Sequence, residues 1–292
     1  MTDSIATARL ALLAQLLDTP PESLASLRRL TPAQLAALTS RLSDELFDAL
    51  APTFAKISKL APLMPDSLVV SVAQKAIPAE VAGRAAGVLG IDHPDRIAGV
   101  LSRMRTDYLA DAAVYVDPRV IPTLAPRVPA EALVPAAREL LRRRHFAVAA
   151  HFLEFCTDDL IRALVQGIDD DEGLLHTAAL IADADRVREI LDVIPTARRN
   201  RIIGAAATGA PAATLAALSV IARLDSKVAA PLARSLFEAC DDRLLGNLVL
   251  LAEREAAMPE LIELSQYADD ATINRLAQHP AFVEQSASGV RA

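Results

Sequence analysis

Arginine side chains are concentrated at two places in this sequence of 292 residues. The members of the two clusters are Arg138, Arg142, Arg143, Arg144 and His145, and Arg198, Arg199 and Arg201. A guanidinium group binds phosphate or carboxylate oxygens through forked hydrogen bonds, so either cluster could hold an anionic ligand or an acidic partner. The helix dipole also favours cations at a helix C-terminus. Because residues 142–144 end a predicted helix, a structural role is the favoured interpretation of the first cluster.

A second group of reactive side chains lies in residues 145–156, HFAVAAHFLEFC. His151 and Glu154 are three residues apart and could face the same side of a helix. A di-iron bundle needs paired Glu-x-x-His helices and further glutamates, and we find no second copy in the sequence. A nucleophile at Cys156 needs a positioned third group, which the sequence does not identify. The phenylalanines of this segment are expected to form a local aromatic core: Phe146, Phe152 and Phe155.

The densest run of carboxylates, residues 169–172, could bind a hard cation such as Mg²⁺. It lacks the alternating ligands and the central glycine of a calcium loop, and it precedes the apolar pair Leu174 and Leu175. We therefore interpret it as a helix cap. The sequence contains no GxGxxG, P-loop, GxSxG, HExxH or CxxC motif. We predict no catalytic residue, no metal site and no cofactor, and an enzyme is the less favoured class.

The composition favours an all-α fold without a nucleic-acid partner. Hydrophobic residues make up 52% of the chain, aromatic residues 3%, and there are only 10 glycines. The apolar residues are mostly Ala, Leu, Val and Ile, and Ala and Leu are strong helix formers. A net charge of −7 disfavours binding to a phosphate backbone. Two cysteines, Cys156 and Cys240, and an N-terminus without a basic region predict unbridged thiols and a cytoplasmic location.

Residues 202–222 carry no charge over a length that could span a bilayer. The stretch is rich in Ala, Gly and Thr and has Pro211 in its middle. We predict two short buried helices, broken at residues 209–211, and no transmembrane span.

Proline recurs in one local context, followed by a small or polar residue and then by an apolar one. Because proline is tolerated in the first turn of a helix, this context predicts helix starts. The six phrases contain Pro32, Pro65, Pro78, Pro94, Pro118 and Pro129. Phrases with acidic residues beginning at Thr157, Cys240 and Ala268 predict helix N-caps in the second half of the chain.

The segments so defined form a degenerate repeat. Residues 77–116 align without a gap on residues 128–167, and 12 of the 40 positions are identical. A unit that cannot bury its apolar face alone must stack on a neighbour. We therefore predict a superhelical stack of short helices, an α-solenoid with HEAT-like repeats. Four regions are expected, namely an N-terminal helical group (1–60), a repeat core (61–200), C-terminal helical repeats (201–284) and a disordered tail (285–292).

The short phrases that open the helices resemble those of the cytosolic N-domain of MgtE-type magnesium transporters. Leu30-Thr-Pro-Ala-Gln-Leu and Thr157-Asp-Asp-Leu-Ile carry the resemblance, which covers about residues 30–200. It implies a stack of MgtE N-domain-like helical repeats. Neither the paired nucleotide-binding module nor the membrane domain of those transporters is recognised here. The resemblance therefore implies a fold and not transport, together with a weak inheritance of divalent-ion sensing by acidic helix starts.

The leading functional hypothesis is a non-catalytic scaffold that binds a partner protein or peptide along residues 77–194, since repeat proteins present long surfaces to partners. Phe152 joins the two arginine clusters as a candidate contact, because large aromatic side chains anchor interfaces. The alternative is a carrier or sensor of an apolar small molecule, a lipid or isoprenoid, suggested by the mean hydropathy of +0.29. Divalent-ion sensing and an enzyme that uses residues 145–156 stay open as further alternatives.

Overall fold

The computed structural model describes residues 65–289 throughout and residues 7–52 in part. In that N-terminal part the described residues are 7, 10–14, 16–17, 19–30, 34–35, 37–39, 41–42, 44–49 and 52. Every regular element among the described residues is a helix and none is a strand, which confirms the all-α prediction. The chain divides into two units, residues 2–169 and residues 170–292, and each is described by itself.

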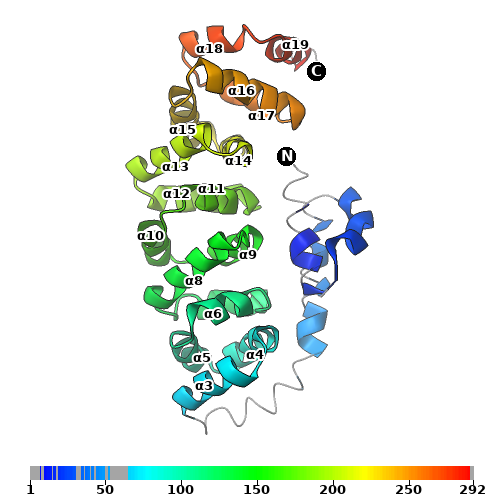
Figure 1. The fold of residues 1–292 in the computed structure, drawn as a ribbon, viewed down its shortest axis with the longest axis vertical. Coiled ribbons are helices and arrows are strands. Elements are labelled where there is room, and N and C mark those ends of the chain that lie inside the picture. Colours follow the sequence, from blue (N-terminus) through cyan, green and yellow to red (C-terminus); the bar gives the residue numbers. More distant parts are fainter. Residues whose placement is uncertain are drawn as a thin grey trace. The chain divides into compact units, whose positions relative to one another are not determined.

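The helices of residues 2–169 stack in two rows. Helices α4, α6, α8 and α10 contact one another in this order, α3, α5 and α7 contact one another likewise, and α9 packs against α8 (Figure 1). The elements are η1 (Pro21–Arg29), α3 (Asp66–Ala76), α4 (Ala79–Asp92), α5 (Pro94–Leu101), α6 (Thr106–Ala113), η3 (Pro118–Val120), α7 (Ile121–Leu124), α8 (Ala130–Arg142), α9 (Phe146–Leu153) and α10 (Asp158–Gly167).

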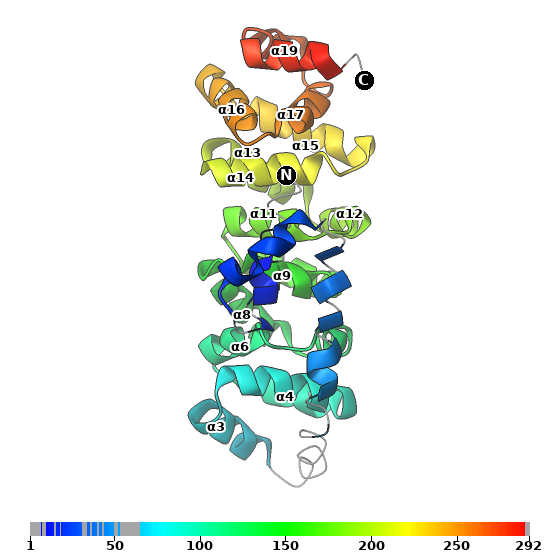
Figure 2. The same cartoon turned by 90° about the vertical axis from the view of Figure 1, so that its right-hand side faces the viewer.

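The second unit continues with helices of similar length. Helices α11, α13 and α15 contact one another in order, while α14 packs against α11 and α17 (Figure 2). The elements are α11 (Asp171–Leu180), α12 (Ala184–Val193), α13 (Thr196–Thr208), α14 (Pro211–Ile221), α15 (Ser226–Glu238), α16 (Asp242–Arg254), α17 (Met258–Ser265), α18 (Asp270–Leu276) and α19 (Pro280–Gly289).

The predicted helix starts are confirmed wherever the structure describes them. Pro65, Pro78 and Pro129 are the N-cap residues of α3, α4 and α8, and Pro94 and Pro118 are the first residues of α5 and η3. The phrase containing Pro32 lies outside the described residues.

The acidic phrases are also confirmed as N-caps. The side chains of Thr157, Asp241 and Asp269 each accept a hydrogen bond from the backbone N–H three residues later. Their oxygens thus satisfy N–H groups that have no partner inside the helix.

The internal alignment matches three consecutive helices with three others. A shift of 51 residues places α4, α5 and α6 on α8, α9 and α10, and each start agrees to within one residue. What the sequence did not predict is the pair of prolines inside helices, Pro135 in α8 and Pro231 in α15.

The uncharged stretch forms the two helices α13 and α14, with the break at Gly209 and Ala210, as predicted. No helix among the described residues is both long enough and apolar enough to cross a membrane.

The expected region limits stay predictions. The chain divides into its two units between Asp169 and Asp170, and α13, which contains residue 200, packs against α11 and α15. Residues 285–289, expected in a disordered tail, belong to helix α19. The limit at residues 60 and 61 lies outside the described residues.

Glycines let α4 approach the next layer closely. The buried residues of α4 are Gly83, Gly87 and Gly90, spaced along one helix face. A β-carbon at Gly83 would overlap the carbonyl oxygen of Ala112, and one at Gly87 would lie 2.6 Å from Cβ of Asp117. The backbone of α4 can therefore lie against the end of α6 only because these positions lack side chains.

We predict that Gly83→Ala lowers the free energy of unfolding by about 1–3 kcal/mol, because a rigid carbonyl oxygen occupies the place of the new methyl group. Urea unfolding followed by circular dichroism measures this. The control is Gly99→Ala in α5, where the nearest atom to the added β-carbon is Asp66 Oδ2 at 3.9 Å. It should leave stability unchanged or raise it by up to about 1 kcal/mol. Equal effects of the two substitutions would contradict the close-approach argument.

Candidate functional site

The first arginine cluster surrounds the C-terminus of α8, as its predicted structural role requires. Beyond Arg142, the N–H of Arg144 donates to the carbonyl of Leu141 at 2.8 Å and the N–H of His145 donates to that of Leu140 at 2.9 Å. Arg144 has a φ of 60°. This is a Schellman ending, in which the left-handed position usually holds glycine. Arg144 therefore carries a side chain at a position where the backbone conformation favours glycine.

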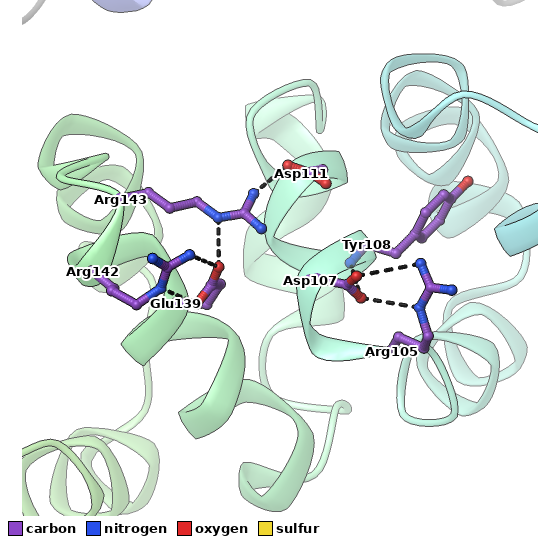
Figure 3. Close-up of polar contacts among 7 residues, drawn as sticks. All are labelled: Arg105, Asp107, Tyr108, Asp111, Glu139, Arg142 and Arg143. Carbon is purple, nitrogen blue, oxygen red and sulfur yellow. Dashed lines mark hydrogen bonds and ion pairs between the residues drawn. The ribbon is translucent and has the colours of Figure 1, made fainter.

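Two arginines of this cluster bind one glutamate. Glu139 accepts hydrogen bonds from Arg142 Nε at 2.7 Å and from Arg143 Nε at 2.6 Å. Arg143 also reaches from the end of α8 to Asp111 of α6 (Figure 3). The hydrogen bonds from Arg142 and Arg143 lower the pKa of Glu139 to about 2. Arg142 and Arg143 are thus already committed to carboxylates of the same unit.

Arg138 and Arg144 differ in whether their guanidinium groups bind another residue. The Arg138 guanidinium donates to the carbonyl of Gly167 at the C-terminus of α10, where a cation is favoured. Arg144 is exposed, and its guanidinium forms no hydrogen bond or ion pair with the described residues. It is the member of the cluster that is available to a ligand.

A second ion pair on α6, also drawn in Figure 3, was not predicted. Asp107 accepts hydrogen bonds from Arg105 Nε at 3.1 Å and from the backbone N–H of Tyr108 at 2.8 Å. These two bonds, the one from Tyr108 first, lower the pKa of Asp107. The Tyr108 hydroxyl donates to the carbonyl of Ile77 at 2.9 Å and so ties α6 to the end of α3.

The second arginine cluster meets the acidic run that the sequence analysis treated separately. Arg198 Nη2 lies 2.6 Å from Asp171 Oδ1, with 9% and 15% of the two side chains exposed. Arg201 Nε lies 3.1 Å from the other carboxylate oxygen of Asp171. Arg199 donates to the hydroxyl of Thr196 at 3.0 Å. This cluster therefore joins α13 to the start of α11.

The acidic run is a helix cap, as predicted. Asp170 is the N-cap of α11, and its side chain accepts a hydrogen bond from Gly173 N–H at 2.8 Å. Within the described part of the chain, no group of three or more His, Cys, Asp or Glu side chains is arranged to hold a metal ion.

Residues 145–156 form α9 and its two ends. His151 Nδ1 lies 3.7 Å from Glu154 Oε2, which is too long for a hydrogen bond, and the His151 ring meets the Phe155 ring edge-on at 5.7 Å. The Cys156 thiol is buried and donates to the carbonyl of Phe152. His145 is the N-cap residue of α9. The contacts of His145, His151 and Cys156 are thus of the kind found at the ends of a helix.

Neither cysteine forms a disulfide, as predicted, and both are buried. Burial raises the pKa of Cys240 to about 11, so its thiol is protonated and unreactive at neutral pH.

Helices α6, α8 and α9 together form an apolar face, which we call the α6–α9 face. Its buried residues are Ala110, Val114, Leu140 and Val148, and the partly buried side chains packed against them are Ala113, Tyr115 and Phe152. Leu12, from the N-terminal part of the chain, packs against the same cluster. Phe152 is thus the one apolar candidate from the sequence that the structure places on this face.

A polar contact also joins the N-terminal part to the repeat helices. Arg119 binds the buried carboxylate of Asp117 through Nη2 at 2.8 Å. Its Nη1 lies 3.0 Å from Asp48 Oδ1, its Nε lies 3.6 Å from Asp44 Oδ1, and its guanidinium carbon lies 6.0 Å from the centre of the Phe47 ring. The hydrogen bond to Asp117, followed by the one to Asp48, raises the pKa of Arg119.

Sequence reasoning missed this docking of the N-terminal part. The sequence predicted an N-terminal helical group over residues 1–60, but no local pattern identified the surface that receives Leu12.

Comparison of the chain with protein-family models, curated proteins and solved structures finds no match. The resemblance to the MgtE-type N-domain stays a prediction.

We predict that Glu139 titrates with a pKa of about 2 and that Arg142→Ala raises this value, since the Arg142 hydrogen bond is the larger cause of the shift. The native pKa lies below the ordinary value, so the ion pairs stabilise the fold above about pH 4.5 and lose this effect as the pH falls toward about 2. Carboxylate ¹³C NMR measures the titration. Arg144→Ala is the control and should leave the pKa of Glu139 unchanged; an unchanged value in Arg142→Ala would refute the assignment.

We also predict that glycine is preferred at the two left-handed helix ends. Ala256 follows α16 with a φ of 54° and the same pair of backbone hydrogen bonds as Arg144. Arg144→Gly and Ala256→Gly should each raise the free energy of unfolding by about 0.5–1 kcal/mol, because glycine has no β-carbon to strain this conformation. Thermal and urea unfolding measure the change, and a loss of stability at both sites would disprove the interpretation.

Proposed function

We propose that this protein is a non-catalytic scaffold that binds a helical segment of a partner protein or peptide on the α6–α9 face. The observation that carries the proposal is the seating of Leu12 on this face. Leu12 belongs to a part of the chain remote in sequence from α6, α8 and α9. A surface that accepts one helix-borne leucine has the apolar character that helix-in-groove recognition requires.

The side chains around this face are of the kind that anchor interfaces. Tyr115 and Phe152 are partly buried against the cluster, and aromatic residues next to arginines are typical of binding hot spots. Arg84 lies over the Tyr115 ring at 5.8 Å and forms an ion pair with Glu80 at 2.9 Å. Arg84 beside the Tyr115 ring favours a partner whose helix carries a carboxylate next to its apolar stripe.

The arginines near the α6–α9 face differ in how well a substitution would test binding. Arg142 and Arg143 are engaged with Glu139 and Asp111, so reversing their charge would disturb the fold as well as any interface. Arg84 borders the α6–α9 face through Tyr115, and its ion pair with Glu80 lies within α4 instead of joining two helices, so Arg84 is the better probe.

We expect Arg84→Glu to reduce the recovery of a bound partner at least tenfold, which corresponds to about 1.4 kcal/mol of binding free energy. Quantitative affinity purification with the full chain as bait measures this. The matched control is Arg162→Glu, since Arg162 pairs with Asp159 on its own helix α10. Circular dichroism must show that both variants are folded. Identical partner sets for both variants would mean that the α6–α9 face has no recognition role.

A further inference from the structure

The N-terminal part of the chain has a small core of its own. Leu10 and Leu35 are buried together, and Leu24, Leu27 and Leu30 pack against them. All five residues of this cluster belong to the N-terminal part. The leucines therefore hold the N-terminal group together whether or not it lies on the α6–α9 face.

The N-terminal group meets the repeat helices through a few contacts of two kinds. Leu12 lies on the α6–α9 face. Asp44, Phe47 and Asp48 contact Arg119, and their spacing of i, i+3 and i+4 places them on one side of a helical turn. The contacts of the described residues thus include an apolar contact at Leu12 and a polar cluster around Arg119.

Arg119 is held ready for this contact. Asp117, with 1% of its side chain exposed, binds Arg119 and lies only two residues from it in the sequence. The side chains of Asp44 and Asp48 are 46% and 71% exposed. Ion pairs of such exposed groups contribute little and are screened by salt. The polar part of the attachment is therefore weak.

We infer that the N-terminal group is a reversible intramolecular cover of the α6–α9 face, and that the partner which displaces it presents a leucine-bearing helix with nearby carboxylates. The residues of the N-terminal group that occupy the site indicate the chemistry of the partner. A segment of this chain with leucines and, on a neighbouring helix, two aspartates already fills the site. A competing segment must match both features, and its apparent affinity is reduced by the fraction of molecules in which the cover is closed. This inference rests on the proposed function.

The test opens the cover by charge reversal at Asp44→Lys with Asp48→Lys, which places two cations against Arg119. The matched control is Glu22→Lys with Glu45→Lys, which makes the same change of net charge at exposed glutamates of the same group. The probe is a fluorescent peptide of residues 5–19, IATARLALLAQLLDT, and its Leu12→Asp form is the negative control. Fluorescence anisotropy measures binding to the full chain, and hydrogen exchange reports on residues 106–116 and 146–153.

In the opened variant we expect hydrogen exchange of these two segments to rise at least fivefold and the peptide to bind at least tenfold more tightly than to the wild type. The control variant should match the wild type, and the Leu12→Asp peptide should not bind. A second variant, Leu12→Asp in the full chain, should open the face in the same way. Melting curves confirm that each variant is folded.

The opposite results separate the two proposals. Equal peptide affinity for wild type and opened variant would show that the face binds helices without a cover, so this inference fails and the proposed function stands. Raised exchange without peptide binding would overturn both. Unchanged exchange in both opening variants would show that these contacts do not hold the N-terminal group in place, and the inference fails.

Discussion

Short helices leave many backbone groups without partners, and the structure depends on satisfying them. The first four N–H groups and the last four C=O groups of a helix have no partner within it, so half of the N–H groups of the 8-residue helices α5, α6 and α9 need another solution. At the N-termini, proline removes a donor and aspartate or threonine accepts from one. At the C-termini, arginine donates. Arg223 is the clearest case, since it donates to the carbonyls of Ser219 on α14 and of Ile181 at the end of α11.

The need to satisfy backbone groups at helix ends explains the positions of several arginines. Burial lowers the pKa of Arg223, yet its guanidinium gains the carbonyl oxygens at the ends of two helices. Other arginines link an aspartate in the preceding layer to their own helix. Such pairs lie 30 or 32 residues apart in sequence, namely Arg127 with Asp95, Arg143 with Asp111 and Arg201 with Asp171. Several of the described arginines thus join layers, so a dense run of arginines in the sequence does not by itself mark a free binding surface.

The α6–α9 face follows from the same arrangement. Helices α6 and α8 are joined by Arg143 and Asp111, and Ala110, Val114 and Leu140, which are close to that ion pair in the sequence, are buried in the apolar cluster. The polar contact and the apolar face thus lie in the same layer. An apolar surface of this kind is covered by another element or used for binding. In this chain the N-terminal group contacts it, and the polar contact of that group is placed on Arg119, beside the buried Asp117.

The sequence by itself determined the all-α class, the helix starts at prolines and acidic caps, the break at residues 209–211 and the cap at residues 169–172. Each of these depends on backbone chemistry within a few residues, so a local pattern is enough to predict it. The partners of the arginines, the meeting of Arg198 with Asp171, the close approach at Gly83 and the seating of Leu12 were decided only by the tertiary structure. These contacts join residues separated by one layer or more, and they depend on how neighbouring helices are oriented, which no local propensity specifies.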